Sequence, residues 1–449
     1  MNQIAILLVG IFILFLVSLL TSKSDFFNPS FIVCTIFLIC TLFALYAVTS
    51  WNINDSIFTP YGTVLILTGI IVFIVGDKLG RRLAPKESIM TPVGNTYSPF
   101  SVSNGKMTII LSFSVFTIAV YIYYVYRYVR ANGYNGGFEL GSIGDYYHQL
   151  TFAEAKQGNI PGFIKILYEF ANAVIYIYMY IFLYNIILCK TKFKDNILFL
   201  IPVICYLPRV IVTSSRTNLI RLAGSTVLLI YIFMNRRSGW KNRKRNFKKI
   251  LRISVISFVS VLVLFYLAVS NGWIGRSTEK TFFDAITVYL GAPIIHFYQF
   301  LSDPPADVMY FGQETFHGLN QIFVRLGLRD TYYSVQLELR RIGYIERGNV
   351  YTFFRRPLHD FGPFGMYLVT IITGFIYSYV YYGKLYRHRM TYKRERVLII
   401  YGYWFYVIYL LPIMNNYCNY ISVTMGYFLV GIYFIYTYLL GGIKFKKHK

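Results

Sequence analysis

The stretch GNVYTFFRRPLHDFGPFGMYLVTIITGFIYSYVYYG, residues 348–383, consists of two chemically different halves. Its first half holds two adjacent arginines, a histidine and an aspartate, whereas residues 364–382 form a long apolar run. A helix needs about 20 apolar residues to cross a hydrocarbon core of about 30 Å. The stretch therefore predicts the place where a polar loop ends and a membrane-spanning helix begins.

The rest of the chain repeats the apolar half of this pattern. Hydrophobic residues make up 56% of the 449 residues, and charged residues make up only 14%. Continuous apolar runs favour helices, because barrel strands must alternate between apolar and polar residues. We therefore expect an all-α polytopic membrane protein with about eleven transmembrane helices. They are predicted at residues 4–20, 30–48, 61–76, 107–126, 161–188, 197–212, 219–233, 253–270, 364–382, 397–414 and 421–440.

The distribution of basic residues predicts how these helices are oriented. Alternate connections between the predicted spans carry 28 of the 44 Lys and Arg residues but only five acidic residues. Basic connections stay in the cytoplasm, so the N-terminus is expected outside and the C-terminus in the cytoplasm. The basic run at residues 235–252 then joins two spans on the cytoplasmic face, where it fixes topology and touches anionic lipid. No nucleic-acid partner is expected.

The predicted spans divide the chain into three regions. Residues 1–271 hold about eight membrane helices, residues 272–363 form a large extracytoplasmic loop, and residues 364–449 hold about three helices and a basic tail. The loop has eight arginines and a single lysine, whereas lysine outnumbers arginine on the predicted cytoplasmic side. A planar guanidinium grips phosphate or carboxylate at two points, which lysine cannot copy. The loop is therefore predicted to bind an anionic ligand.

Two segments inside this loop have local patterns of their own. Residues 282–301 are apolar but interrupted by Gly, Pro, Asp and His, which predicts short interfacial or re-entrant helices. Residues 332–348 predict a short amphipathic helix, in which Glu338 and Glu346 belong to a solvated, salt-bridged surface. No cluster of residues has metal-ligand spacing, and neither a metal nor another cofactor is expected.

Two short motifs carry a resemblance to a known family. The first lies at the end of the loop, and the second is SSRTN at residues 214–218, in a tight outer connection. The residues of the first motif are Asn349, Tyr351, Thr352, Asp360, Phe361, Gly362 and Gly365. They resemble the Asn-x-Tyr-Thr and Asp-Phe-Gly-x-x-Gly elements of the Wzy-like polymerases, also called oligosaccharide repeat unit polymerases. The single large outer loop late in the chain is similar to the layout of that family.

The resemblance implies an enzyme of the bacterial cytoplasmic membrane with a GT-C-like polymerase or ligase architecture. Such a glycosyltransferase joins glycan repeat units that are linked to undecaprenyl pyrophosphate into O-antigen, capsular or exopolysaccharide at the outer membrane face. Donor and acceptor are both lipid-linked glycans, and a chain-length regulator and a flippase are implied as partners. Pyrophosphate is a good leaving group, so arginines that neutralise its charge serve in place of a metal.

Within this family pattern we expect particular residues to form the site. The donor pyrophosphate and sugars are expected to contact Arg216, Arg276, Arg355, Arg356, Asn349 and Tyr351. The general base that removes the proton of the acceptor hydroxyl is expected to be Asp360 or His359. Three of these residues also have a purely structural explanation. Asp360 can cap a helix, His359 can be an interface residue, and Arg216 can be an arginine that extends to the outer interface.

Three other classes of membrane protein stay open at this point. A ligase that passes finished glycan to another acceptor shares the large outer loop and much of the chemistry. A flippase for lipid-linked oligosaccharides is expected to have two related halves, and the sequence has no internal repeat. A channel or secondary transporter is expected to place ionisable groups at mid-membrane, and the predicted spans have few.

Overall fold

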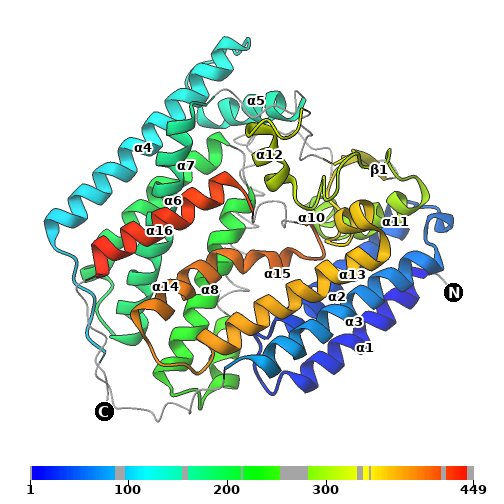
Figure 1. Ribbon diagram of the computed structural model, residues 1–449, viewed down its shortest axis with the longest axis horizontal. Coiled ribbons are helices and arrows are strands. Elements are labelled where there is room, and N and C mark those ends of the chain that lie inside the picture. The colour runs from blue at the N-terminus through cyan, green and yellow to red at the C-terminus, as the bar shows by residue number, and fades with distance from the viewer. Residues whose placement is uncertain are drawn as a thin grey trace. The chain divides into compact units, whose positions relative to one another are not determined.

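The computed structural model describes residues 3–85, 97–153, 160–213, 216–252, 282–330, 337–342, 345–415 and 421–441 (Figure 1). Its elements in chain order are α1 (Gln3–Thr21), α2 (Pro29–Ser50), η1 (Asp55–Ile57), α3 (Pro60–Leu83), α4 (Asn104–Ala131), α5 (Leu140–Ala153), α6 (Gly162–Leu183), η2 (Tyr184–Leu188), η3 (Lys194–Leu200), α7 (Ile201–Val212), α8 (Arg216–Arg237), α10 (Phe282–Leu290), α11 (Ala292–Ser302), α12 (His317–Arg325), β1 (Arg340–Ile342), β2 (Ile345–Gly348), α13 (Arg355–Val380), η4 (Tyr381–Leu385), α14 (Tyr392–Trp404), α15 (Tyr406–Leu410) and α16 (Val423–Leu440).

The chain forms two compact units. Unit 1 consists of Met1–Lys86, Thr278–Lys384 and Val407–Ser422, and unit 2 consists of Glu87–Ser277, Leu385–Tyr406 and Val423–Lys449. These units cut across the three linear regions 1–271, 272–363 and 364–449, because helices that are far apart in sequence pack together within unit 1.

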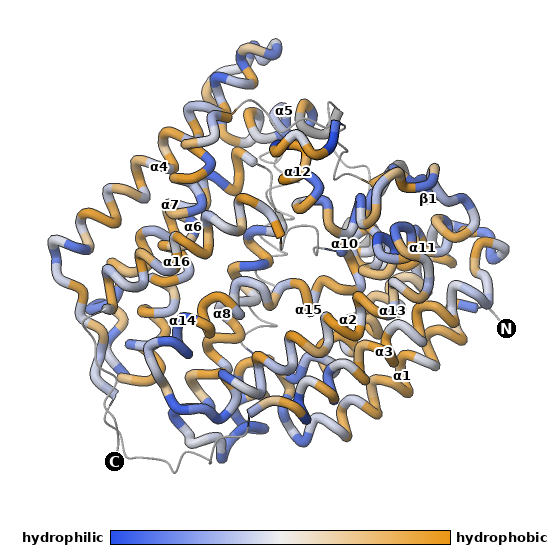
Figure 2. Tube along the Cα trace, viewed as in Figure 1, coloured by the Kyte–Doolittle hydropathy of each residue, from blue (hydrophilic) through white to orange (hydrophobic). Residues whose placement is uncertain are grey.

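Among the described residues, nine helical segments are long and apolar enough to cross a membrane. They are Gln3–Thr21, Pro29–Ser50, Pro60–Leu83, Asn104–Ala131, Gly162–Leu188, Lys194–Val212, Thr217–Arg237, Arg355–Leu385 and Val423–Leu440. Figure 2 shows apolar residues along these helices, as in α1, and polar residues around β1. The prediction of an all-α multi-pass membrane protein is therefore confirmed at this level.

The exact number of eleven spans and the orientation of the termini remain predictions. The span predicted at 253–270 lies outside the described residues. The span predicted at 397–414 is not one continuous helix, because a turn at Phe405 divides it between α14 and the short helix α15.

In unit 1 the helices α1, α2, α3 and α13 run side by side (Figure 1). The pair α3 and α13 approach closely because glycines line their contact. A Cβ at Gly76 or Gly80 would collide with the carbonyl oxygens of Ile371 and Phe375, and one at Gly374 would lie 2.5 Å from the Phe73 carbonyl oxygen. Small residues spaced in this way let helix backbones touch, which is a common basis for helix association in membranes.

Polar groups join the same helices at the end of α3. The buried Asp77 carboxylate accepts hydrogen bonds from the Ser30 hydroxyl at 2.6 Å, from the Asn28 amide at 3.0 Å and from the Ser378 hydroxyl. Asn28 also caps α2, because its side-chain oxygen accepts the Phe31 backbone N–H at 3.0 Å. A buried carboxylate is tolerated here because each of its oxygens is hydrogen-bonded.

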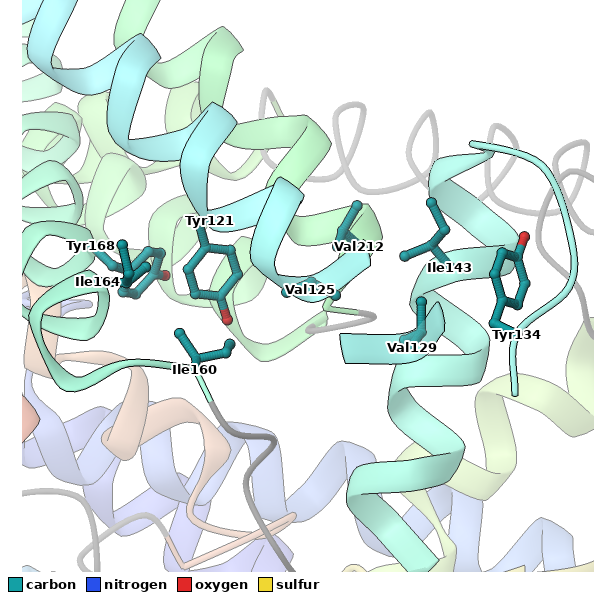
Figure 3. Close-up of a cluster of buried hydrophobic side chains, with 9 residues drawn as sticks. All are labelled: Tyr121, Val125, Val129, Tyr134, Ile143, Ile160, Ile164, Tyr168 and Val212. Atoms are coloured by element: carbon teal, nitrogen blue, oxygen red, sulfur yellow. The ribbon is translucent and has the colours of Figure 1, made fainter. Parts of the chain in front are cut away.

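Unit 2 is organised around α6, most of whose side chains after Ala171 are buried. Figure 3 shows the apolar cluster where α4, α5, α6 and α7 meet, with Tyr121 and Tyr168 facing one another. Their ring centroids lie 5.0 Å apart. At the other end of α6, Tyr180 donates to Glu395 at 2.8 Å, and Glu395 also forms a buried ion pair of 2.8 Å with Arg236.

The extended loop segment confirms one local prediction and corrects another. Residues 282–301, expected to form short helices, form α10 and α11. The amphipathic helix predicted at 332–348 is wrong for its described part, because β1 and β2 pair antiparallel instead. Ile342 stands opposite Ile345 in this ladder, and β-branched side chains suit a pleated strand.

We expect Gly76→Ala to destabilise the protein, because the added methyl group must push α3 away from the α13 backbone. Overpacking of this kind costs about 1–3 kcal/mol. The melting temperature of the purified protein in detergent measures it. Gly105→Ala in α4 is the matched control, since nothing lies within 4 Å of a Cβ there. Equal melting temperatures for both variants would contradict the close packing of α3 on α13.

Candidate functional site

The site predicted at the end of the large loop lies in unit 1, where residues 349–354 lead into α13. Two hydrogen bonds of the Phe353 backbone, one donated by its own N–H and one accepted from a side-chain amide, hold this segment in place. The Phe353 N–H donates to the Leu411 carbonyl at 2.8 Å, and the Asn415 amide donates to the Phe353 carbonyl at 3.0 Å. Tyr351 and Thr352 are buried, whereas Asn349 is half-buried. The Asn-x-Tyr-Thr motif is thus mostly an internal part of the fold.

Tyr351 joins this segment to the strand region. Its hydroxyl donates to the Glu338 carbonyl at 3.0 Å and accepts from Arg340 Nε at 3.3 Å. The imidazole Nδ1 of His296 on α11 donates to the Val350 carbonyl at 2.8 Å. Each of these contacts holds the backbone just before α13, so Tyr351 acts as an anchor for the turn that follows.

Arg355, the first residue of α13, is completely buried and is held by two carboxylates. One end of its guanidinium contacts Glu314, and the other lies 2.6 Å from Glu338. The guanidinium carbon lies 4.7 Å from the centre of the Phe300 ring. Buried ion pairs persist only with good geometry and further hydrogen bonds, and here two acids share one fork-shaped cation. Arg355 therefore links the loop, the strand region and α13.

His359 lies one turn further along α13 and faces the same glutamate. Its Nδ1 is 3.1 Å from Glu314 Oε1, while Arg356 donates to the Glu314 backbone carbonyl at 3.1 Å. A carboxylate only accepts, so Nδ1 carries a proton, and in the neutral imidazole Nε2 keeps its lone pair. Nε2 has no hydrogen-bond partner among the described residues. A carboxylate that orients a histidine in this way is the usual arrangement of a general base.

Asp360 has a different set of partners. Its carboxylate accepts the Thr315 N–H at 2.6 Å and the Glu314 N–H at 3.1 Å. These donors belong to the turn that precedes α12, so Asp360 caps that turn rather than the start of α13. The backbone of α13 then bends at Gly362, where φ is +68°, a value that favours glycine. The bend separates the turn that carries His359 and Asp360 from the apolar part of the helix.

The charge state of Glu314 follows from these neighbours. Burial alone would raise the pKa of Glu314, but the hydrogen bond from His359 and the charges of Arg355 and Arg356 outweigh it. The pKa of Glu314 is therefore lowered, and the side chain is a carboxylate at neutral pH.

The remaining predicted ligands are in unit 2 or outside the described part of the chain. Arg216 is the first residue of α8, and Arg276 lies outside the described residues. A pyrophosphate clamp that combines them with Arg355 or Arg356 therefore stays a prediction. In the described segments, no group of three or more His, Cys, Asp or Glu side chains is placed to hold a metal ion.

Sequence reasoning missed the role of Glu314 and misread that of Glu338. Glu338 was expected on a solvated surface, but it pairs with buried Arg355 and lies 3.6 Å from Arg340. No local spacing reveals Glu314, because it stands 41 positions before Arg355 and 45 before His359. The need of Arg355 for an acid becomes visible only once the structure shows that it is completely buried.

Comparison of the chain with protein-family models, curated proteins and solved structures finds no match. The resemblance to Wzy-like polymerases therefore rests on the two motifs at residues 214–218 and 349–365.

We expect Arg355→Met to lower stability by about 3 kcal/mol or more, because it leaves two partly buried carboxylates without their cation. Thermal unfolding in detergent measures the loss. Arg341→Met, at an exposed arginine of the same region, should change little. Adding Glu338→Gln to Arg355→Met should restore part of the loss, and no restoration would argue against the ion pair.

The lowered pKa of Glu314 predicts how acid affects stability. A carboxyl group whose pKa is lower in the folded state stabilises the protein above its ordinary pKa of 4.5 and loses that contribution as pH falls. Between pH 6 and pH 4 the melting temperature of the wild-type protein should therefore fall more steeply than that of Glu314→Gln. Asp307→Asn, at an exposed acid, should keep the wild-type slope. Parallel curves for wild type and Glu314→Gln would contradict this assignment.

Proposed function

We propose that this protein is a Wzy-like polymerase of lipid-linked glycan repeat units at the outer face of a bacterial cytoplasmic membrane. The observation that carries the proposal is the pair of Glu314 and His359 at the end of the motif segment. It supplies an oriented imidazole with an unused nitrogen next to a membrane helix, within residues that resemble the family motif.

The proposed reaction needs one base and a stabilised leaving group. A hydroxyl of the acceptor sugar attacks the anomeric carbon of the donor glycan, and a new glycosidic bond forms. The bond between that carbon and the pyrophosphate oxygen breaks, and the electron pair leaves with undecaprenyl pyrophosphate. The proton of the acceptor hydroxyl goes to the base. No oxidant, reductant or metal is needed for this balance.

In this proposal His359 Nε2 is the base, and Glu314 is a positioning residue that fixes the tautomer. Asp360 positions Glu314 in turn, since its carboxylate accepts the backbone N–H of Glu314. Because Nε2 is buried in the free protein, the acceptor hydroxyl reaches it only after the covering side chains move.

The arginines divide into two groups in the same proposal. Both ends of the Arg355 guanidinium contact carboxylates, so we assign Arg355 to holding Glu314 and Glu338 in place. Arg216, Arg276 and Arg356 remain the proposed ligands of the donor pyrophosphate, where a planar fork matches phosphate oxygens. Asn349 and Tyr351 shape the turn before α13, with Asn349 the more accessible of the two to a sugar.

The proposal is tested in cells that lack this protein and carry either the wild-type gene or His359→Gln. We expect the wild type to restore polymer, and the variant to leave single repeat units on their lipid at the outer face. Loss of a general base lowers rates by about 10²–10⁴-fold. The measurement is the size and sidedness of lipid-linked glycan. His448→Gln, in the basic tail, is the control that should restore normal polymer.

Other outcomes assign the protein to another class. Units trapped at the inner face would indicate a flippase, and long polymer that stays on its lipid would indicate a ligase. Unchanged glycan in cells without the protein would exclude every function of this kind. Normal polymer length with His359→Gln, at normal protein level, would exclude His359 as the base.

A further inference from the structure

Two arginines of unit 2, Arg209 on α7 and Arg221 on α8, lie within segments that are apolar enough to span a membrane. Neither was assigned to the site in unit 1. A charged side chain at such a depth is costly unless it meets a partner of opposite charge or water. The neighbours of each guanidinium group therefore show whether its charge is compensated within the protein or requires a ligand.

Arg209 is surrounded by tyrosines. Its side chain is only 7% exposed, and its guanidinium carbon lies 3.7 Å from the ring centre of Tyr168 and 5.7 Å from that of Tyr121. It donates one hydrogen bond of 2.7 Å to the Tyr206 hydroxyl. Tyrosine rings offer their negative faces to a cation but carry no full charge, so they compensate Arg209 only in part.

Arg221 has the same kind of neighbours. It donates to the Tyr403 hydroxyl at 2.5 Å, and its guanidinium carbon lies 4.6 Å from the Tyr403 ring centre and 4.1 Å from that of Tyr406. Arg221 is half-buried, in contrast with Arg209. The guanidinium group of each arginine is thus surrounded by tyrosine rings and does not lie against a carboxylate.

Neither arginine forms an ion pair with a carboxylate in the part of the chain that the structure describes. The Nε atoms of both are buried and have no hydrogen-bond partner there. Among the described residues, Glu169 on α6 lies within electrostatic range of Arg221, and its carboxylate accepts the Asn172 amide at 3.3 Å. Two guanidinium groups with buried, unused Nε–H donors and one nearby acid leave an excess of positive charge, which calls for an anion.

The exposed side chains around the two arginines indicate whether the anion reaches them from water or from lipid. On α7 and α8, around the two arginines, the exposed large apolar side chains are Ile204, Leu207, Ile211, Leu219 and Ile220. A surface of this kind faces lipid rather than water. Guanidinium forks match phosphate oxygens, and a group that reaches them from the lipid phase must be attached to a hydrocarbon tail.

We propose that Arg209 and Arg221 form a binding site for the phosphoryl group of a lipid within unit 2. The bound group receives hydrogen bonds from the unused Nε–H groups and neutralises the excess charge. Tyr168 and Tyr403 hold the two guanidinium planes in place before the lipid arrives. The site does not depend on the polymerase reaction, so it is tested by binding and not by polymer formation.

The experiment uses the full-length protein in nanodiscs of phosphatidylcholine. Binding of undecaprenyl pyrophosphate without sugar is measured by native mass spectrometry and by the shift in melting temperature. We expect saturable binding that Arg209→Lys and Arg221→Lys each weaken roughly tenfold or more, because lysine keeps the charge but loses the fork. Arg127→Lys, at an exposed arginine on α4, is the matched control and should bind as the wild type does.

Two further probes identify the source of the phosphoryl group. Inorganic pyrophosphate and phosphatidylglycerol are tested in the same nanodiscs. Binding of either lipid with the same dependence on Arg209 and Arg221 supports the proposal and names the lipid. Binding of inorganic pyrophosphate alone, or lipid binding that neither substitution changes, overturns it.

A measurement on the wild-type protein covers the case in which the lysine variants do not fold. Phenylglyoxal modifies accessible guanidinium groups, and the modified residues are located by peptide mass spectrometry. We expect bound undecaprenyl pyrophosphate to protect Arg221 while Arg127 is modified as before. Equal modification of Arg221 without lipid and with either undecaprenyl pyrophosphate or phosphatidylglycerol overturns the proposal.

Discussion

The buried cation Arg355 joins the loop before α12, the segment before β1 and the start of α13 in unit 1. Arg355 cannot be removed from water without compensation, and it takes one carboxylate from the loop before α12 and another from the segment before β1. Once Glu314 is placed in this way, its second oxygen is directed at His359, and its backbone N–H meets Asp360. The orientation of the imidazole is therefore a consequence of the charge balance of an arginine that need not touch any ligand.

The architecture was largely predictable from the sequence, because apolar length and composition act locally. The same is true of α10 and α11, whose interrupted apolar pattern matched short helices. The close approach of α3 and α13 was not predictable, since Gly76 becomes informative only when Ile371 is known to face it. The sequence of β1 and β2 also predicts a helix, because the spacing of its four charged residues and two isoleucines fits both a helical and a strand period. The cross-strand pairing of Ile342 with Ile345 decides between the two.

The candidate site shows why residue type alone does not assign a role. The sequence predicts Arg355, Arg356, His359 and Asp360 as a group, and the structure places them on the first two turns of α13. It does not mark their partners, because Glu314 is more than 40 positions away. The arginines of the large loop predict an anionic ligand, but a buried arginine can instead be balanced by groups of the protein itself, and these groups differ between the two units. Arg355 is balanced by two internal acids, whereas Arg209 is balanced only by tyrosines.

The polar contacts at the end of α3 have a consequence for how the protein is made. Asp77 and Asp25 belong to the first part of the chain, but Ser378 follows Asp77 by 301 residues and Tyr381 follows Asp25 by 356. A ribosome that adds 5–20 residues per second needs roughly 15–60 s for that interval. During this time the first three helices are in the membrane without the hydroxyl groups that later satisfy both acids. A chain that terminates before α13 lacks the Ser378 donor to Asp77 and the Tyr381 donor to Asp25, a difference by which cellular proteases can distinguish unfinished protein from finished protein.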